Sequence, residues 1–216
     1  MRDKTVTDTR SAGYFLDVFI ELTDHLRCPA DHTEQFLVLL PDAMEGRAVL
    51  RGTLGCPVCG RVIMVEDGEV DFGGRAPGPA PTTLTADAIA AFLGLQGPGG
   101  HLALIGGAAV LAEPLCDLLP RVHVVAVNPP LRLTDGERLS VVRGDRLPLK
   151  SASMRGVVVA ADHALAEWIE RAARVVLPGN RIVVEGPRLS TDRLELLGEA
   201  AGVWVGRRPT ASLHQP

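Results

Sequence analysis

Apolar residues in the second half of the chain recur in two alternating patterns. Short apolar runs, typical of buried strands, alternate with longer stretches in which apolar residues recur every third or fourth position, as on one face of a helix. This alternation predicts an α/β fold with a doubly wound, mostly parallel sheet covered by helices on both faces. We expect strands at 101–105, 122–127, 139–142, 156–160, 181–185 and 203–207, and helices at 86–95, 110–119, 162–174 and 191–201.

Small and polar residues mark the ends of two of these helices. Thr85 is a typical N-cap residue in front of 86–95, and the Gly-Pro-Gly-Gly run at 97–100 should end that helix. Gly202 is well placed to close the last predicted helix.

The first 72 residues follow a different pattern. Residues 11–26 place their apolar side chains on one face of a predicted amphipathic helix, and two cysteine-bearing turns follow it. The Gly- and Pro-rich stretch 73–83 has no periodicity and is typical of a linker. We therefore expect a small α+β domain at 1–72 and the α/β domain at 84–216.

Composition and charge exclude several classes of protein. Hydrophobic residues make up 46% of the 216 residues, enough for a packed core. No apolar run reaches the roughly 20 residues that cross a bilayer, and the polar start lacks a signal peptide's apolar centre. We expect a cytoplasmic protein without a membrane partner. Residues 1–75 hold 8 Lys and Arg against 13 Asp and Glu, and 76–216 hold 14 against 13, so we do not expect nucleic acid as a partner.

Three cysteines lie in turns with metal-ligand spacing. Cys56 and Cys59 belong to CPVCG, in which a tight turn directs two sulfurs at one ion. Upstream, Cys28 is followed by Asp31 and His32, and either of these could complete a tetrahedral zinc site. The other interpretation is that the cysteines are buried thiols without a metal.

This region resembles the small zinc-ribbon proteins that serve as activating partners of tRNA, rRNA and release-factor methyltransferases. The likeness lies in LTDHLRCPAD and LGCPVCGRVIMVEDGEVDF and covers about residues 20–72. Asp31 replaces a cysteine of the family pattern, and Ile63-Met64 replaces its Tyr-Pro. The resemblance implies a structural zinc and a role in contacting proteins.

Residues 84–207 resemble class I S-adenosylmethionine-dependent methyltransferases. Three stretches carry the likeness in the family's order, namely VVRGDRLPLKSASMRGVVVAADHAL, AARVVLPGNRIVVEGP and LELLGEAAGV. The resemblance implies a truncated Rossmann-like sheet and S-adenosylmethionine as the cofactor. In this family the first strand ends in a carboxylate and a G-x-G-x-G turn, whose glycines let the backbone approach the cofactor.

The resemblance implies cofactor contacts at Gly106, Gly107, Asn128 and Asp145. Gly106 keeps the first glycine of the turn, and the backbone at 106–108 could still hold the cofactor. Asp145 stands where the family contacts the adenine amino group. Asn128 replaces the acidic residue at the end of the second strand, so it keeps an acceptor oxygen but loses the charge.

Other positions of this site depart from the family pattern. Leu104 stands where a carboxylate is usual, and Ala108 and Val110 replace the second and third glycines. A β-branched valine restricts the backbone and would crowd the cofactor. These departures favour weak or absent cofactor binding.

Two polar residues follow the fourth predicted strand, where a substrate would lie. His163 could act as a base there. We favour the alternative that Asp162 is the N-cap of the next helix and that His163 lies in its first turn. We expect Trp168 to be a packing residue of that helix.

Three functions remain. The first is a catalytically degenerate methyltransferase fold that works as a binding, scaffold or regulatory subunit. The second is an active, divergent methyltransferase acting on a small molecule or a protein. In the third, the zinc ribbon docks a separate partner protein. The first is favoured, with a protein partner or self-association.

Overall fold

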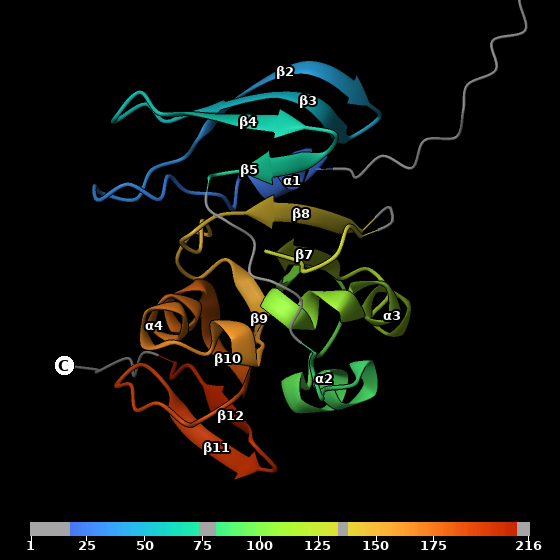
Figure 1. The fold of residues 1–216 in the computed structure, drawn as a ribbon, viewed down its shortest axis with the longest axis vertical. Coiled ribbons are helices and arrows are strands. Elements are labelled where there is room, and N and C mark those ends of the chain that lie inside the picture. Colours follow the sequence, from blue (N-terminus) through green and yellow to red (C-terminus); the bar gives the residue numbers. More distant parts are fainter. Residues whose placement is uncertain (1–17, 74–80, 134–137, 211–216) are drawn as a thin grey trace, which may run out of the picture.

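The computed structural model describes residues 18–73, 81–133 and 138–210. One sheet runs through the molecule, and helices pack on both of its faces (Figure 1). The strands are β1 (Val18–Phe19), β2 (Val38–Glu45), β3 (Ala48–Gly55), β4 (Val62–Glu66), β5 (Glu69–Asp71), β6 (His101–Ile105), β7 (His123–Val127), β8 (Leu139–Arg143), β9 (Met154–Val159), β10 (Val176–Glu185), β11 (Glu195–Ala200) and β12 (Val203–Arg207). The helices are α1 (Ile20–Thr23), α2 (Ala86–Leu93), α3 (Ala112–Leu118) and α4 (Ala166–Val175), with 3₁₀ turns η1 (Gly106–Leu111) and η2 (Ala161–His163).

Five parallel strands form the centre of the sheet in the order β8-β7-β6-β9-β10. With β6 counted as the first, this is the order 3-2-1-4-5 of a Rossmann fold. The chain moves from β6 to β7 and β8, and then returns to the other side of β6 for β9 and β10. The order therefore reverses between β6 and β9, and sheets of this kind bind ligands at that switch point. The predicted α/β fold with a mostly parallel sheet is confirmed.

The predicted strands of this sheet are also confirmed, as β6 to β10 and β12. All five residues of β6 are buried, because helices and the N-terminal segment cover both faces. Strands buried on both faces are continuous apolar runs, which explains why the sequence pattern located them.

The predicted helix at 191–201 is wrong, because these residues form β11 and the loop before it. Ala201 and Gly202, with φ angles of 49° and 76°, make the tight turn to β12. Two successive positive φ angles are typical of a type I′ hairpin turn. Gly202 thus closes a hairpin rather than a helix, and β11 pairs with β12 in antiparallel orientation.

The other predicted helices exist but differ from the prediction in length: α3 is slightly shorter, and α4 begins four residues later, at Ala166. Of the predicted helix 11–26, only Ile20–Thr23 is helical within the described residues, and 11–17 lie outside them. The helix that begins at Ala86 is capped by Thr85 as predicted, with its side chain accepting the Ala88 N–H. It ends at Leu93, because Gly94 adopts the left-handed conformation before the run at 97–100 is reached.

Alternate side chains of the central strands enter two cores. Leu102 and Leu104 of β6 pack with α2 and α3 on one face. Ala103 and Ile105 pack on the other face with α4 and with the segment that contains α1. Leu104, at the position of the family's carboxylate, is a core residue with no exposed surface.

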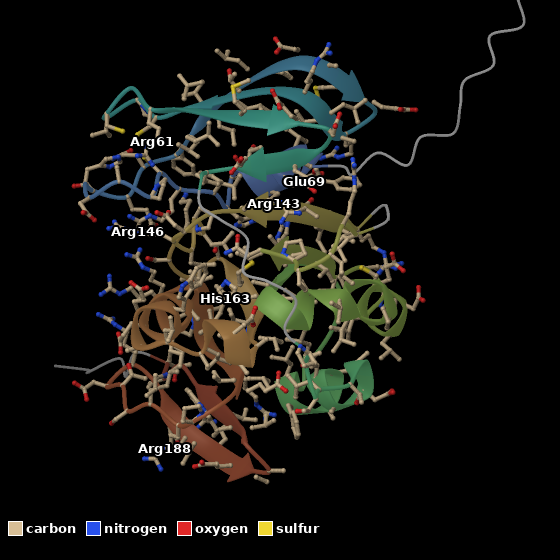
Figure 2. All side chains as sticks on the ribbon, viewed as in Figure 1. Arg61, Glu69, Arg143, Arg146, His163 and Arg188 are labelled. Atoms are coloured by element: carbon tan, nitrogen blue, oxygen red, sulfur yellow. The ribbon has the colours of Figure 1, made fainter. Side chains whose placement is uncertain are left out.

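The N-terminal segment extends the same sheet. Strands β2 to β5 form an antiparallel ribbon, and β5 pairs in parallel with β8. Glu69 of β5 and Arg143 of β8 reinforce this junction with an ion pair of 2.8 Å between Oε2 and Nε (Figure 2). The expected linker at 73–83 includes 74–80, which lie outside the described residues, and the segments on its two sides share one sheet.

A second contact joins the two segments near the first cysteine. Leu26 bridges Leu149, the Arg27 N–H donates to the Pro148 carbonyl, and the Lys150 N–H donates to the His25 carbonyl. Among the described helices, none is both long and apolar enough to cross a membrane.

Candidate functional site

A tight turn between β3 and β4 carries the first pair of cysteines. The Cys56 N–H donates to the Arg61 carbonyl at 2.8 Å, and the Gly60 N–H donates to the Cys56 carbonyl at 3.0 Å. Gly60 has a φ of 71°, which a residue without a side chain adopts readily. These bonds close the turn and bring the Cys56 and Cys59 sulfurs to the same side.

The loop that follows α1 supplies the second half of a four-residue cluster. The Cys28 Sγ lies 3.7 Å from the Cys59 Sγ, and the His32 Nε2 lies 3.3 Å from the Cys56 Sγ. All four ligand atoms lie within 4.8 Å of one another. Two thiolates bound to zinc at about 2.3 Å are separated by about 3.8 Å in a tetrahedron. The spacing therefore fits a tetrahedral ion with three sulfur ligands and one nitrogen ligand.

Hydrogen bonds prepare His32 and Cys56 to act as ligands. The His32 Nδ1–H donates to the Thr33 carbonyl at 2.7 Å, which leaves the Nε2 lone pair facing the cluster. This hydrogen bond raises the pKa of His32 above its ordinary value. Against the opposing effect of burial, backbone N–H groups of Cys59 and Val58 lower the pKa of Cys56 to about 7. A thiol with a lower pKa ionises more readily to the thiolate that binds metal.

Asp31 does not join the cluster, although the sequence left it open as the fourth ligand. Its side chain is 89% exposed and forms an ion pair of 3.0 Å with Arg146. Arg146, which follows β8, also donates to the Pro29 carbonyl at 3.3 Å. Asp31 and Arg146 therefore hold the cysteine loop against the end of β8, and His32 is the residue that faces the sulfurs.

The second candidate site is the switch point of the sheet, where β6 and β9 end side by side. Gly106 follows β6 with a φ of 68°. The next N–H, of Gly107, donates to Asp162 Oδ1 at 3.1 Å. A Cβ atom at Gly106 would lie 2.4 Å from that oxygen and 2.3 Å from His163 Nδ1. The space beside the glycine turn is therefore filled by two side chains of the same protein.

Asp162 and His163 belong to a buried polar network. His163 lies near the centre of the molecule (Figure 2). His163 Nδ1 lies 3.1 Å from Asp162 Oδ2, although the two atoms are poorly aligned for a hydrogen bond. The Asn128 amide donates to the Gly144 carbonyl at 2.8 Å and accepts the Gly144 N–H at 2.9 Å. These two bonds fix the orientation of the amide, so that Nδ2 also faces His163 Nε2 at 3.3 Å.

The groups around the Asp162 carboxyl favour its ionised form. Burial acts against the charge, but the adjacent imidazole of His163 and the Gly107 N–H outweigh it. The pKa of Asp162 is therefore lowered below its ordinary value. The switch point thus contains a carboxylate that belongs to the chain itself.

The prediction that Asp162 caps a helix is wrong. Helix α4 begins at Ala166, its N-cap residue is Leu165, and no side chain caps it. Asp162 and His163 lie in η2 before that helix. The prediction for Trp168 is confirmed, because its side chain is buried and meets His163 edge-on at 4.6 Å between ring centroids.

The structure brings together three of the four residues to which the resemblance assigned cofactor contacts. Gly106, Gly107 and Asn128 all lie at the switch point, within the network around His163. Asp145 is exposed, and its N–H donates to the Gly73 carbonyl. The contact between Asp162 and Gly107 was missed, because it joins residues 55 positions apart. The available signal was Asp162 itself, an acidic residue three positions after β9, the strand beside β6 and its glycine turn.

No protein-family model and no curated protein matches the chain. A solved complex between the Haloferax volcanii Trm112 methyltransferase activator and a methyltransferase matches at 22% identity, over 46% of this chain and 50% of the other, with a TM-score of 0.39. The chain thus spans half the length of that relative.

Two solved methyltransferases are similar at lower identity. The antibiotic-resistance methyltransferase Kmr matches at 16% identity, over 62% of this chain and 97% of the other, with a TM-score of 0.42. Geranyl diphosphate C-methyltransferase from Streptomyces coelicolor A3(2) matches at 14% identity, over 46% and 43% of the two chains, with a TM-score of 0.36.

Proposed function

We propose that this chain is a catalytically degenerate methyltransferase-like protein that works as a protein-binding or regulatory subunit, with a structural zinc in its N-terminal segment. One observation carries the proposal: the Asp162 carboxylate accepts the Gly107 N–H at the switch point. Glycine turns after the first strand of such sheets offer their N–H groups to anionic ligands. Here the chain's own carboxylate takes that place.

The free energy of cofactor binding would have to compensate for breaking this network. Asp162 would leave a buried position, and a buried polar partner left unmade costs about 1–3 kcal/mol. Asn128 is already bonded to both backbone groups of Gly144. Leu104 offers no carboxylate. Each loss alone could be compensated, but together they favour weak or absent binding of S-adenosylmethionine.

Titration calorimetry with S-adenosylmethionine tests this proposal on the intact protein. We expect no binding heat at micromolar concentrations. Asp162→Ala, which opens the crevice, is compared with Asp192→Ala, which changes an exposed carboxylate in the loop before β11. A dissociation constant in the low-micromolar range for the unmodified protein would overturn the proposal.

Zinc fits the residues of the cysteine cluster. Cys28, His32, Cys56 and Cys59 would hold it, and the all-protein set of four ligands is typical of structural rather than catalytic zinc. Bound zinc would fix the loop after α1 to the turn between β3 and β4. That loop contacts the end of β8 through Arg146, so the metal would also stabilise the junction between the ribbon and the central sheet.

An active, divergent methyltransferase is the second candidate. It is favoured by the positive φ of Gly106 and by the position of the Asp162–His163 pair at the ends of β6 and β9. If η2 moved away, the glycine turn would be free and His163 could act as a base. Transfer of a radiolabelled methyl group to a small molecule or protein would support this candidate. The absence of both turnover and cofactor binding would remove it.

A further inference from the structure

Helix α2 and the β11–β12 hairpin lie at the end of the molecule opposite the ribbon (Figure 1). An apolar groove is lined by residues of these elements. Its volume is about 630 Å³, within the range of ligand sites in proteins. Its walls include Ala91 and Phe92 of α2, Leu197 of β11, and Val203 and Val205 of β12.

The groove exists because no helix covers this part of the sheet. Residues 186–194, which join β10 to β11, contain no helix. Sheets of a doubly wound fold are normally covered on both faces. Here Phe92 is 38% exposed and Leu197 is 40% exposed, and both border the groove. An apolar strip of the sheet is therefore left for another element to cover.

Arg181 places a positive charge at the border of this groove. The Arg181 Nη1 donates to the Phe92 carbonyl at 2.9 Å, which fixes the guanidinium beside α2. Within the described residues, Arg181 has no carboxylate partner. Glu199 also borders the groove, but it pairs across the hairpin with Trp204, whose side chain enters the opposite core. Because cross-strand partners share a face, Glu199 directs its carboxylate to that other side.

We propose that this groove receives an amphipathic helix of a partner protein, with its apolar face against α2 and the hairpin and a carboxylate against Arg181. The proposal rests on the function proposed above and names the surface and the partner class. A helix seated in an apolar groove is a recurrent mode of recognition. The fixed guanidinium adds the requirement for an acidic residue beside the apolar face.

The groove is less suited to a second copy of this chain. Of the two described helices of eight or more residues, α4 buries its large apolar residues in a core, and the exposed Phe92 of α2 is itself part of the groove wall. An extended partner strand is also disfavoured. The edge strand β11 has a bulge at Leu197, between the pairs formed by Leu196 and Gly198, and bulges interrupt edge pairing.

Photocrosslinking from two neighbouring residues tests the proposal on the full chain in the cells that make it. Leu196 and Leu197 are 41% and 40% exposed, but Leu196 borders a different cavity, beside Trp204. Benzoylphenylalanine is placed at either position, and the crosslinked peptide is sequenced. We expect position 197 to capture one peptide with apolar residues at helical spacing and an adjacent Asp or Glu, at least tenfold more than position 196.

Charge reversal supplies the second measurement. Arg181→Glu should lower the crosslink yield at position 197 at least tenfold. Arg155→Gln, which removes another arginine that donates to backbone carbonyls near the end of α2, should leave the yield unchanged. If Arg181→Glu does not fold, Leu197→Asp and Leu196→Asp are each tested as competitors of the unmodified chain for the captured partner. Leu197→Asp should compete poorly, and Leu196→Asp should compete as well as the unmodified chain.

Other outcomes would overturn the inference. These are a crosslink to this chain itself, a peptide without helical apolar spacing, equal capture from both positions, or no capture at all. The cofactor titration decides the proposed function separately. If the chain binds S-adenosylmethionine and still captures the helix, only the proposed function is disproved. If it binds no S-adenosylmethionine and captures no helix, only the proposal that the groove docks a helix is disproved.

Discussion

The Glu185 carboxylate, at the end of β10, accepts both the backbone N–H and the hydroxyl of Thr83, each at 2.6 Å. Its second oxygen accepts the Thr82 hydroxyl at 2.9 Å. Glu185 is only 6% exposed. A buried carboxylate thus attaches the start of the α/β segment to a strand about a hundred residues further along the chain.

Removal of that carboxylate should destabilise the protein. We expect Glu185→Ala to lower the free energy of unfolding by about 3 kcal/mol, because it removes three hydrogen bonds that this buried side chain accepts from Thr82 and Thr83. Urea unfolding monitored by circular dichroism measures the effect. The control is Glu199→Ala, an exposed change that should stay within about 0.5 kcal/mol. Equal losses in the two variants would contradict this role of Glu185.

Substitution of Gly106 separates backbone strain from crowding. Gly106 and Gly97 both have positive φ angles, of 68° and 73°, but a Cβ at Gly97 would meet no atom within 4 Å. The left-handed backbone costs alanine about 1–2 kcal/mol at either position. Crowding against Asp162 and His163 should add about 1–3 kcal/mol to Gly106→Ala alone. If denaturant titrations gave the same loss for both variants, the crevice would be open rather than filled.

The metal cluster predicts different effects for two adjacent residues. Purified protein should contain about one zinc per chain, measured by elemental analysis. His32→Ala should lose most of the metal and lower the melting temperature, because one of four ligands is removed. Asp31→Asn should keep its zinc, since Asp31 pairs with Arg146 instead. A result in which Asp31→Asn loses the metal and His32→Ala retains it would reverse the assignment.

A stack of three histidines predicts destabilisation in acid. His101 lies between His25 and His123, with ring centroids 4.4 and 5.3 Å away. Burial, with a smaller effect from the two neighbouring imidazoles, lowers the pKa of His101 to about 3. Burial likewise lowers the pKa of His123 to about 4. Both values lie below the roughly 6.5 of an unfolded chain, so the unfolded state binds more protons.

The free energy of unfolding should therefore be highest above pH 6.5 and fall as the pH drops toward 4 and then 3. His101 and His123 each contribute a loss of about 2 kcal/mol between pH 6.5 and pH 5. Urea unfolding at a series of pH values measures the slope. His101→Phe keeps a ring in the stack and should reduce the slope by about half. An unchanged slope in that variant would show that other groups cause the acid sensitivity.

The sequence pattern located the central strands because they are buried on both faces, where apolar runs are unambiguous. It could not distinguish β11 from a helix, because Leu194, Leu196 and Leu197 fit either spacing and the deciding element is the turn at Ala201 and Gly202. The site depended still more on three-dimensional contacts. Neither the choice of His32 over Asp31 nor the bond from Gly107 to Asp162 has a local signature, since both depend on chain segments that meet only after folding.

The parallel pairing of β5 with β8 couples the unfolding of the ribbon to that of the central sheet. A ladder of backbone hydrogen bonds, reinforced by Glu69 and Arg143, passes from the ribbon into the central sheet. The ribbon cannot melt without exposing an edge of the sheet beside it. Calorimetry should therefore record one cooperative transition, and a protease cut engineered between residues 74 and 80 should leave two fragments that still elute as one particle.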